Sequence, residues 1–321
     1  MSDGPRANPP DDEARVVESF GRHLIVETRD GHRKPARLFG RRISTVCGDR
    51  VLLGSAQHDS DEPRVVTDVL PRTTLFARTD TRGRSEPLAA NLSLLVVLLA
   101  PEPASDPFII DRYLAGAAYA GIDTAVALSK VDLPSARAES FVRVAEEYRR
   151  AGYLVLGVSA RTGEGLDALR ALLQEHTGML VGQSGVGKST ITNALVPGSE
   201  RPTRELSTST GEGRHTTVSA ALYRLPGGGE LIDTPGVRDY APAPVAEQLV
   251  DTGWPEIAAL AVACRFNDCL HLREPGCAVT AALAAGSLSA RRYESYKRLL
   301  NLMRSLLPAH ERPGPGRPRS G

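Results

Sequence analysis

The chain has 321 residues, of which 41% are hydrophobic and 24% charged, and its formal net charge is +1. This length predicts two or three domains instead of one core, and the near-neutral charge excludes a chain that is a polycation throughout. The longest apolar runs, such as residues 94–100, are far shorter than the ~20 residues of a membrane-spanning helix, and no charged-then-apolar leader opens the chain, so we expect a cytoplasmic protein that contacts no membrane.

The amino-terminal part is predicted to be a tail followed by a small barrel. Residues 1–14 are rich in Pro, Asp and Gly without a periodic pattern, which is typical of disorder. Residues 15–85 carry short apolar runs separated by turn signals such as Asp30-Gly31 and Gly48-Asp49. This spacing predicts a β-barrel, and the pattern alone leaves an OB-like and an SH3-like barrel open.

Residues 86–245 are predicted to form an α/β domain with a parallel sheet, because strand and helix patterns alternate. After a buried-strand pattern at 92–100, we expect helix 107–120, strand 122–128, helix 134–151, strand 153–158, helix 165–175 and strand 178–181. Residues 246–307 are mostly helical in pattern and end in an amphipathic stretch at 290–307. Residues 308–321 are rich in Pro, Gly and Arg and are predicted to be disordered.

Residues 182–189 read GQSGVGKS, which matches the phosphate-loop pattern G-x-x-x-x-G-K-S between a strand and a helix. Backbone N–H groups of such a loop surround phosphate oxygens, Lys188 can reach the β and γ phosphates, and the Ser189 hydroxyl can bind Mg²⁺. The predicted nucleotide contacts of this loop are Gly182, Gln183, Ser184, Gly185, Val186, Gly187, Lys188, Ser189 and Thr190.

The tetrapeptide SKVD at residues 129–132 ends a predicted strand and is typical of guanine recognition. The Asp132 carboxylate can accept two hydrogen bonds from guanine that adenine cannot supply, and Lys130 would lie along the base. Ser129 stands where Asn is commoner. Ser159 and Ala160 end the next predicted strand, where a backbone N–H can reach guanine O6. These residues together predict GTP in preference to ATP.

The tetrapeptide DTPG at residues 233–236 follows a further strand. We expect Asp233 to hold Mg²⁺ through water and the Gly236 N–H to reach the γ-phosphate. In the polar stretch before it, Thr217 is favoured over Thr216 as the residue that binds Mg²⁺ when the γ-phosphate draws the loop in.

The residue that orients the attacking water is not settled by the motifs. Val237 follows DTPG, where Ras-like enzymes carry the glutamine that orients this water. A valine cannot do so. His215 is therefore a candidate catalytic residue, beside Thr217 and Gly236, and the alternative that it only stabilises its loop is equally open.

The order of the motifs is unusual, because the guanine motif precedes the phosphate loop and DTPG comes last. Ordinary GTPases begin with the phosphate loop, so this order predicts a circularly permuted GTPase. Further along, Cys264-x₄-Cys269-x-His271-x₅-Cys277 supplies three thiolates and one imidazole, a set that suits a structural tetrahedral Zn²⁺. We interpret Cys47 as an inert small side chain.

As a set, these motifs resemble the RsgA (YjeQ) family of circularly permuted GTPases over residues 15–307. Residues 46–51 (VCGDRV), Asn91 and residues 213–217 (GRHTT) add to the match. The resemblance implies an N-terminal OB-fold, a central permuted GTPase domain and a C-terminal zinc domain. It also implies GTP hydrolysis stimulated by the small ribosomal subunit, a late role in the maturation of that subunit, and a contribution of His215 to hydrolysis.

The partners that follow are the small subunit with its rRNA, GTP and GDP, and other subunit assembly factors, with the chain itself a monomer. Basic residues of the barrel could contact RNA phosphates, or form only a solvated charged surface; they are Arg33, Lys34, Arg37, Arg41 and Arg42. Two other functions stay open: a binding module in which GTP only locks the shape, and a permuted GTPase of the large subunit. Asp132 disfavours a generic ATPase.

Overall fold

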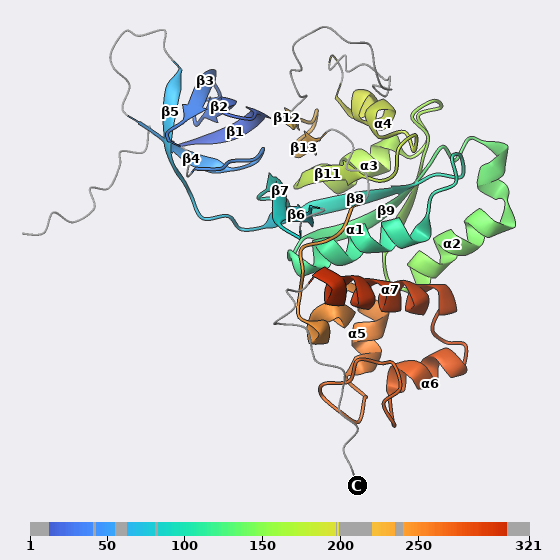
Figure 1. Ribbon diagram of the computed structural model, residues 1–321. Helices are drawn as coiled ribbons and strands as arrows, with labels where there is room; N and C mark the ends of the chain where they lie inside the picture. The colour runs from blue at the N-terminus through green and yellow to red at the C-terminus, as the bar shows by residue number, and fades with distance from the viewer. Residues whose placement is uncertain are drawn as a thin grey trace, which may run out of the picture.

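The computed structural model describes residues 13–40, 43–54, 63–80, 83–196, 198, 220–234 and 240–306. Figure 1 shows a small barrel at the amino-terminal end, an α/β region beside it, and a group of helices below that region. The barrel, the α/β sheet and the helical region therefore follow one another as the sequence predicts.

The barrel closes because β1 pairs with both β2 and β4, while β3 runs parallel to β5. Its core contains the fully buried Val16, Val26 and Val51, from alternating positions of their strands. This closed Greek-key arrangement is that of an OB barrel and not of an SH3-like one. The strands are β1 (Glu13–Phe20), β2 (His23–Thr28), β3 (Arg33–Leu38), β4 (Arg50–Leu53) and β5 (Arg64–Val69).

The first strand begins earlier than the sequence predicts. β1 starts at Glu13, inside the segment 1–14 assigned to a tail. Ala14 is buried in the barrel core, so the alternation of buried positions continues to the start of the strand. The other domain boundaries stay predictions.

The α/β region is built on a sheet with the order β10-β9-β8-β11-β13-β12. Neighbours from β10 to β13 are parallel, and β12 is antiparallel to β13. Every residue of β8 is buried, as expected for a strand covered on both faces. The elements are β8 (Leu94–Leu99), α1 (Pro107–Tyr119), β9 (Asp123–Ser129), a 3-10 helix (Pro134–Arg137), α2 (Glu139–Arg150), β10 (Leu154–Val158), α3 (Leu166–Leu173), β11 (Thr177–Val181), α4 (Lys188–Leu195), β12 (Ala221–Arg224) and β13 (Glu230–Asp233).

The helix predicted over 134–151 is interrupted. Ala138 has an extended backbone, with φ −61° and ψ 136°, and separates the 3-10 helix from α2. Among the described residues no side chain caps either helix at this break. The sequence therefore carries no capping signal from which the interruption could have been predicted.

The barrel and the α/β sheet are joined in two ways. β1 pairs with β12 at Glu18 and Ala221, which makes the two sheets continuous. The hairpin of β6 (Leu75–Thr79) and β7 (Ser85–Ala90) connects them along the chain. Cys47 of the barrel is buried in the α/β core, and burial raises the pKa of its thiol to about 12, as expected of an inert side chain.

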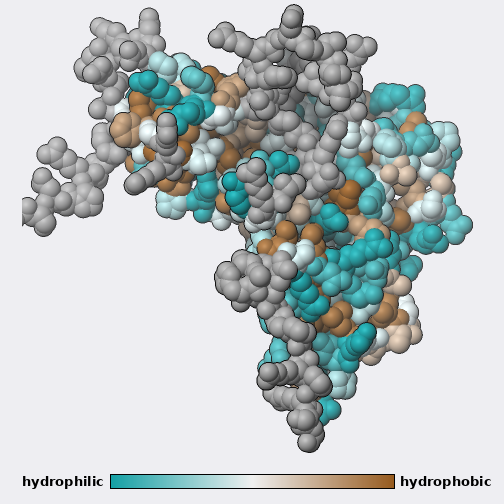
Figure 2. All heavy atoms as spheres, in the orientation of Figure 1, coloured by the Kyte–Doolittle hydropathy of each residue, from teal (hydrophilic) through white to brown (hydrophobic). Residues whose placement is uncertain are grey.

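The carboxyl-terminal helices pack around Trp254, Tyr296 and Met303, all buried. Figure 1 shows α7 running beneath α1, between the α/β region and the helices α5 and α6. On the face in Figure 2, hydrophilic residues gather over this part of the molecule. The elements are a 3-10 helix (Glu247–Gly253), α5 (Pro255–Ala261), α6 (Ala278–Ala284) and α7 (Ala290–Leu306). Within the described ranges, the structure contains no helix with the length and apolarity needed to cross a bilayer.

A buried group of charges holds α7 against α1. Asp111 of α1 accepts from Arg292 at 2.6 Å and from Arg291 at 2.8 Å. Arg292 also donates to Glu256 of α5 at 2.6 Å. Asp111 and Arg292 are each 1% exposed. Burial would raise the pKa of Asp111, but the two arginines hold it below its usual range.

Candidate functional site

The phosphate loop lies between β11 and α4, as the sequence predicts. Gly182 has φ +146°, and a Cβ there would approach Leu98 O to 2.8 Å, so both the backbone and the space require glycine. The Lys188 ammonium donates to the carbonyls of Gly182 at 2.8 Å and Gln183 at 2.7 Å. Ser189 follows in the first turn of α4 and is exposed. The lysine and the helix amino terminus thus face the same loop, which is the arrangement that binds phosphate oxygens.

The guanine motif ends β9 and reaches the phosphate loop directly. The buried Ser129 hydroxyl donates to Val186 O at 2.7 Å. Lys130 has a left-handed backbone, with φ +56°, and its ammonium donates to Glu102 O at 2.7 Å. A Cβ on Gly187 would lie 3.9 Å from Lys130 Cε, so the lysine stem passes beside the loop.

Asp132 is held by the end of the next strand. Its carboxylate accepts from the Ser159 hydroxyl at 2.5 Å and from Arg161 Nε at 2.7 Å. These two hydrogen bonds hold the pKa of Asp132 below its usual range. Asp132 is therefore ionised near neutral pH and acts as a hydrogen-bond acceptor.

These residues surround a cavity of about 310 Å³. Its lining includes seven of the predicted nucleotide residues, namely Ser129, Lys130, Asp132, Ala160, Val186, Gly187 and Thr190. It also includes Leu133, Arg161 and Ile191, which lie outside the predicted motif residues. Arg161 directly follows Ser159-Ala160, and that position is the signal from which it could have been found.

A second cavity, of about 390 Å³, lies between the barrel and the sheet. Its arginines are paired with carboxylates, as Arg15 with Glu230 at 2.5 Å and Arg29 with Glu13 at 2.9 Å. Because these charges already neutralise one another, the first cavity is the better candidate for a nucleotide.

Asp233 ends β13 at the same edge of the sheet as the phosphate loop. Ile232 pairs with Met179 of β11, the strand that leads into the loop. Asp233 itself is in register with Ala221 of β12. The other predicted residues of this side, His215, Thr216, Thr217, Gly236 and Val237, lie outside the described residues.

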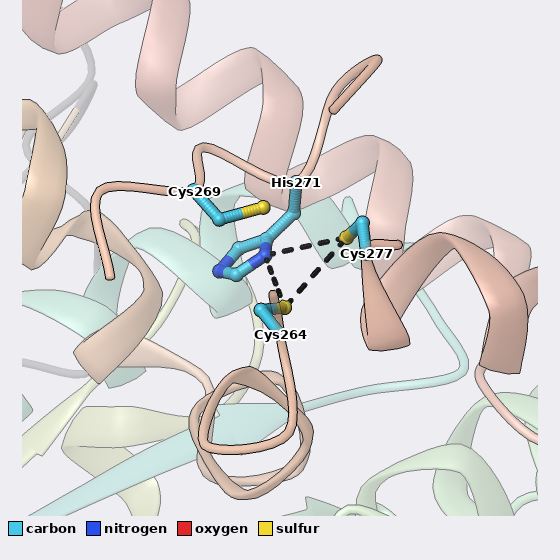
Figure 3. A group of neighbouring side chains, drawn as sticks. All are labelled: Cys264, Cys269, His271 and Cys277. Carbon is cyan, nitrogen blue, oxygen red and sulfur yellow. Dashed lines mark hydrogen bonds between the residues drawn. The ribbon is translucent and has the colours of Figure 1, made fainter. Parts of the chain in front are cut away.

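The predicted cysteine and histidine ligands, which lie in the chain between α5 and α6, converge on one another (Figure 3). The ligand atoms of Cys264, Cys269, His271 and Cys277 all lie within 4.8 Å of one another. His271 Nδ1 is 3.5 Å from the sulfur of Cys264 and 3.6 Å from that of Cys277, and these two sulfurs are 3.9 Å apart. Donors around a tetrahedral ion with zinc-like bond lengths lie ~3.6–3.8 Å apart, so the four residues fit a metal ion.

The surroundings of this cluster favour metal ligation. Asp251 Oδ2 is 3.5 Å from His271 Nε2, the ring nitrogen that points away from the thiols, and such a carboxylate fixes the ring of a ligating histidine. Burial would raise the pKa of Cys277, but hydrogen bonds from Thr280 and His271 lower it to about 7.

Comparison with known proteins agrees with this geometry. The RsgA GTPase family model matches residues 69–242. The "small ribosomal subunit biogenesis GTPase RsgA" of Pseudomonas aeruginosa (strain LESB58) is 40% identical over 295 residues, covering 92% of this chain and 86% of the relative. The chain belongs to the RsgA GTPase family. The protein of the same description from Azotobacter vinelandii is also 40% identical, over 91% of this chain and 85% of its own length.

Solved structures give the same fold. YjeQ from Thermotoga maritima has a TM-score of 0.68 and 27% identity, and the match covers 91% of this chain and 98% of that one. YloQ, a circularly permuted GTPase, has a TM-score of 0.67 at 22% identity, with 92% and 96% covered, which shows the fold alone. The predicted family, permuted fold and GTPase activity are confirmed for this RsgA family member.

Proposed function

We propose that this chain hydrolyses GTP in the biogenesis of the small ribosomal subunit, and that the subunit and its rRNA stimulate hydrolysis. The observation that carries the proposal is the cavity in which the guanine motif meets the phosphate loop. The small subunit enters the proposal because the two relatives that are 40% identical are small ribosomal subunit biogenesis GTPases by name. Neither relative is named for the large subunit, the alternative partner that the motifs leave open.

The nucleotide roles in this proposal follow the chemistry of the site. Asp132 accepts from the guanine edge, with Ser129, Ser159 and Ala160 shaping its surroundings, and Lys130 lies along the base. The phosphate loop, from Gly182 to Thr190, holds the phosphates.

Magnesium and the attacking water complete the catalytic proposal. Ser189, Thr217 and, through water, Asp233 hold Mg²⁺. Gly236 meets the γ-phosphate, and His215 orients the water or supports the loop that does.

In this proposal the barrel and the helical region contact the small ribosomal subunit. Lys34 and Arg37 are exposed on β3 and available for RNA phosphates, whereas Arg33 already pairs with Glu27 at 3.3 Å. Arg41 and Arg42 lie outside the described residues. A structural Zn²⁺ bound by the Cys₃His cluster stabilises the helical region. The protein works in the cytoplasm as a monomer, beside other assembly factors.

The proposal is tested by GTP turnover with purified small subunits, with large subunits and with neither. We expect small subunits to raise the rate by at least about tenfold, within the range up to ~10⁵-fold that partner proteins produce. Large subunits should leave it unchanged. An Asp132→Asn variant should lose GTP turnover and gain turnover of xanthosine triphosphate, which ties the activity to this cavity. Equal rates with and without small subunits would refute the proposal and favour the binding module.

A further inference from the structure

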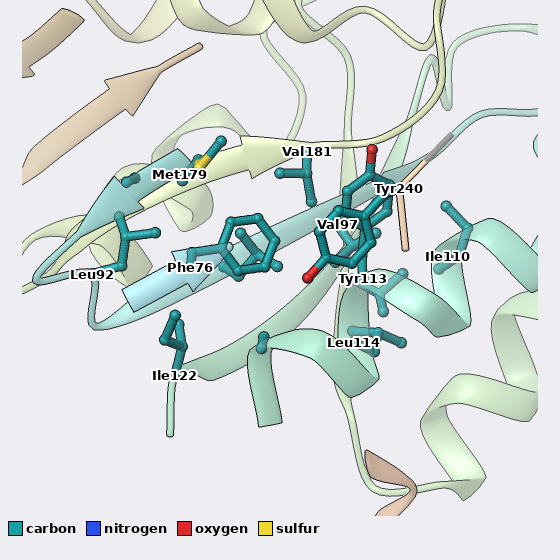
Figure 4. Close-up of a cluster of buried hydrophobic side chains, with 14 of the residues drawn as sticks. Phe76, Leu92, Val97, Ile110, Tyr113, Leu114, Ile122, Met179, Val181 and Tyr240 are labelled. Atoms are coloured by element: carbon teal, nitrogen blue, oxygen red, sulfur yellow. The ribbon is translucent and has the colours of Figure 1, made fainter. Parts of the chain in front are cut away.

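Tyr240 is the first described residue after the DTPG motif, and it is completely buried. Its ring lies between two others, with centroid distances of 4.5 Å to Tyr113 of α1 and 5.2 Å to Phe76 of β6. Both pairs are stacked, with interplanar angles of 15° and 16°. Figure 4 shows Tyr240 over Tyr113 in the core beside the sheet, with Phe76 next to them. Stacking of this kind fixes the position of a ring.

The space around this ring is closely fitted. The Tyr240 hydroxyl donates to Ala77 O at 3.2 Å. On the side of α1, a Cβ on Gly116 would approach the Tyr240 hydroxyl to 2.1 Å and clash with it. The small residue at 116 is therefore what allows the tyrosine to reach its place.

The backbone after Tyr240 is also fastened. Thr79 of β6 donates through its N–H to Ala241 O and through its hydroxyl to Pro242 O, both at 2.8 Å. Arg78 and Pro242 form an antiparallel bridge. Residues 240–242 thus extend the β6–β7 hairpin, which links the barrel to the sheet.

The chain before the motif is held at the other end. β13 pairs with β11 and β12 up to Asp233. The described residues that flank 235–239 are therefore each held at a fixed point, Asp233 in the sheet and Tyr240 in the ring stack. Because the second point rests on β6 and α1, it ties the motif to the elements that join the barrel and the carboxyl-terminal helices to the GTPase region.

We propose that Tyr240 is a positioning residue for GTP hydrolysis, which anchors the downstream end of the DTPG segment so that Gly236 meets the γ-phosphate. The inference rests on the proposed function. Only the triphosphate has a γ-phosphate for Gly236 to contact. Loss of the anchor should therefore weaken binding of GTP and not of GDP.

The test compares Tyr240→Leu, which removes the stack, with Tyr240→Phe, which keeps the ring and loses only the hydroxyl. Tyr296→Leu is the matched control, because Tyr296 is 1% exposed and packs edge-on against Trp254 in the helical region. Affinities for GDP and a non-hydrolysable GTP analogue are measured by fluorescence titration. Single-turnover hydrolysis is followed with small subunits present.

For Tyr240→Leu we expect GTP-analogue affinity to fall about tenfold, GDP affinity to stay within about twofold, and stimulated hydrolysis to fall at least about tenfold. Tyr240→Phe should behave as the unmodified protein. If Tyr240→Leu does not fold, Gly116→Ala takes its place, because the added methyl group displaces the same ring from the side of α1. Gly116→Ala should likewise lower the affinity for the GTP analogue and leave the affinity for GDP unchanged.

If Tyr240→Leu loses GDP and GTP-analogue affinity equally, the assignment is overturned and the ring is a structural element only. The assignment also fails if Tyr296→Leu shows the same selective loss of GTP-analogue affinity. If Tyr240→Leu and Gly116→Ala retain full stimulated hydrolysis, the assignment also fails. An unmodified protein that binds neither nucleotide would instead refute the proposed function, and the anchor with it.

Discussion

The Ser129 hydroxyl joins the two halves of the nucleotide site. It is buried at the end of β9 and donates to Val186 O, in the middle of the phosphate loop. Asn is commoner than Ser at this position of the motif. The short side chain of Ser129 is nevertheless long enough to make this hydrogen bond. The bond sets the base-reading strand against the phosphate loop.

Replacing Ser129 with Ala should therefore weaken nucleotide binding. The change leaves the buried Val186 carbonyl without this donor, at a cost of about 1–2 kcal/mol, or roughly 5- to 30-fold in affinity. GDP affinity measured by calorimetry tests this. Ser287→Ala is the control, because that exposed hydroxyl also donates to a backbone carbonyl, Ala282 O at 3.1 Å, but far from the cavity. Unchanged GDP affinity in Ser129→Ala would contradict the linking role.

At this scale the sequence predicts motif residues well and their neighbours poorly. Lys130 and Asp132 fall in the cavity because a motif needs given side chains at a fixed spacing on one strand end. Leu133 and Ile191 were missed because an apolar residue has no chemical signature of its own. Arg161 directly follows the predicted Ser159-Ala160, but the guanine motifs assign no role to the residue at that position.

At the scale of elements, the packing of α7 on α1 depends on a buried ion pair. Asp111 and Arg292 face each other at 1% exposure, and Glu256 and Arg291 complete the group. Removing one partner of such a pair leaves an uncompensated buried charge, which costs more than the pair itself contributes.

We therefore expect Arg292→Met to destabilise the protein by about 3–5 kcal/mol. The double variant Asp111→Leu, Arg292→Met should recover a large part of this loss. Urea unfolding tests both, followed by the fluorescence of Trp254, the single tryptophan of the chain, which is buried in the helical region. Arg150→Met is the control, because Arg150 pairs with Glu146 at the surface of α2 and should change stability by less than about 1 kcal/mol. A single variant as stable as the control would refute this account.

Periodicity predicted most of these elements, including strand β8 and helix α1, but not how they meet. Cys47 was expected to be inert, and its place in the core of the α/β region could not be foreseen. Gly48 passes so close to Ala90 O that a Cβ would come within 2.1 Å of it. Such contacts join residues far apart in the chain, and no local pattern encodes them.

For the whole molecule, the permuted order places the barrel before the guanine-reading strands and the metal cluster after DTPG. The cavity residues lie on or next to β9, β10 and α4, whereas the metal ligands lie between α5 and α6. The metal cluster and the nucleotide cavity are thus built from separate elements. The helical region packs on the GTPase region through α7 and through the 3-10 helix, where Tyr119 of α1 donates to Val250 O at 2.8 Å. Loss of the metal should therefore act first on the helices.

The metal loop is tied to α7 by two buried tyrosines. Tyr293 donates to His271 O at 2.7 Å and Tyr296 donates to Leu270 O at 2.8 Å. If the metal leaves, the loop that supplies these carbonyls loses its support, and the helical region should loosen.

We predict that a chelator, or the variant Cys269→Ser, makes residues 254–306 open to limited proteolysis and hydrogen exchange. Small-subunit binding should weaken as well, while GDP affinity stays within about twofold, because none of the described cavity residues lies in this region. Cys47→Ala, a cysteine change remote from the cluster, should keep the full metal content and remain protected. Mass spectrometry of the fragments measures the exposure of residues 254–306, and metal content and GDP affinity are measured on the same samples. Protection of residues 254–306 without metal, or GDP affinity lost before that protection, would show that the cluster does not stabilise the helical region on its own.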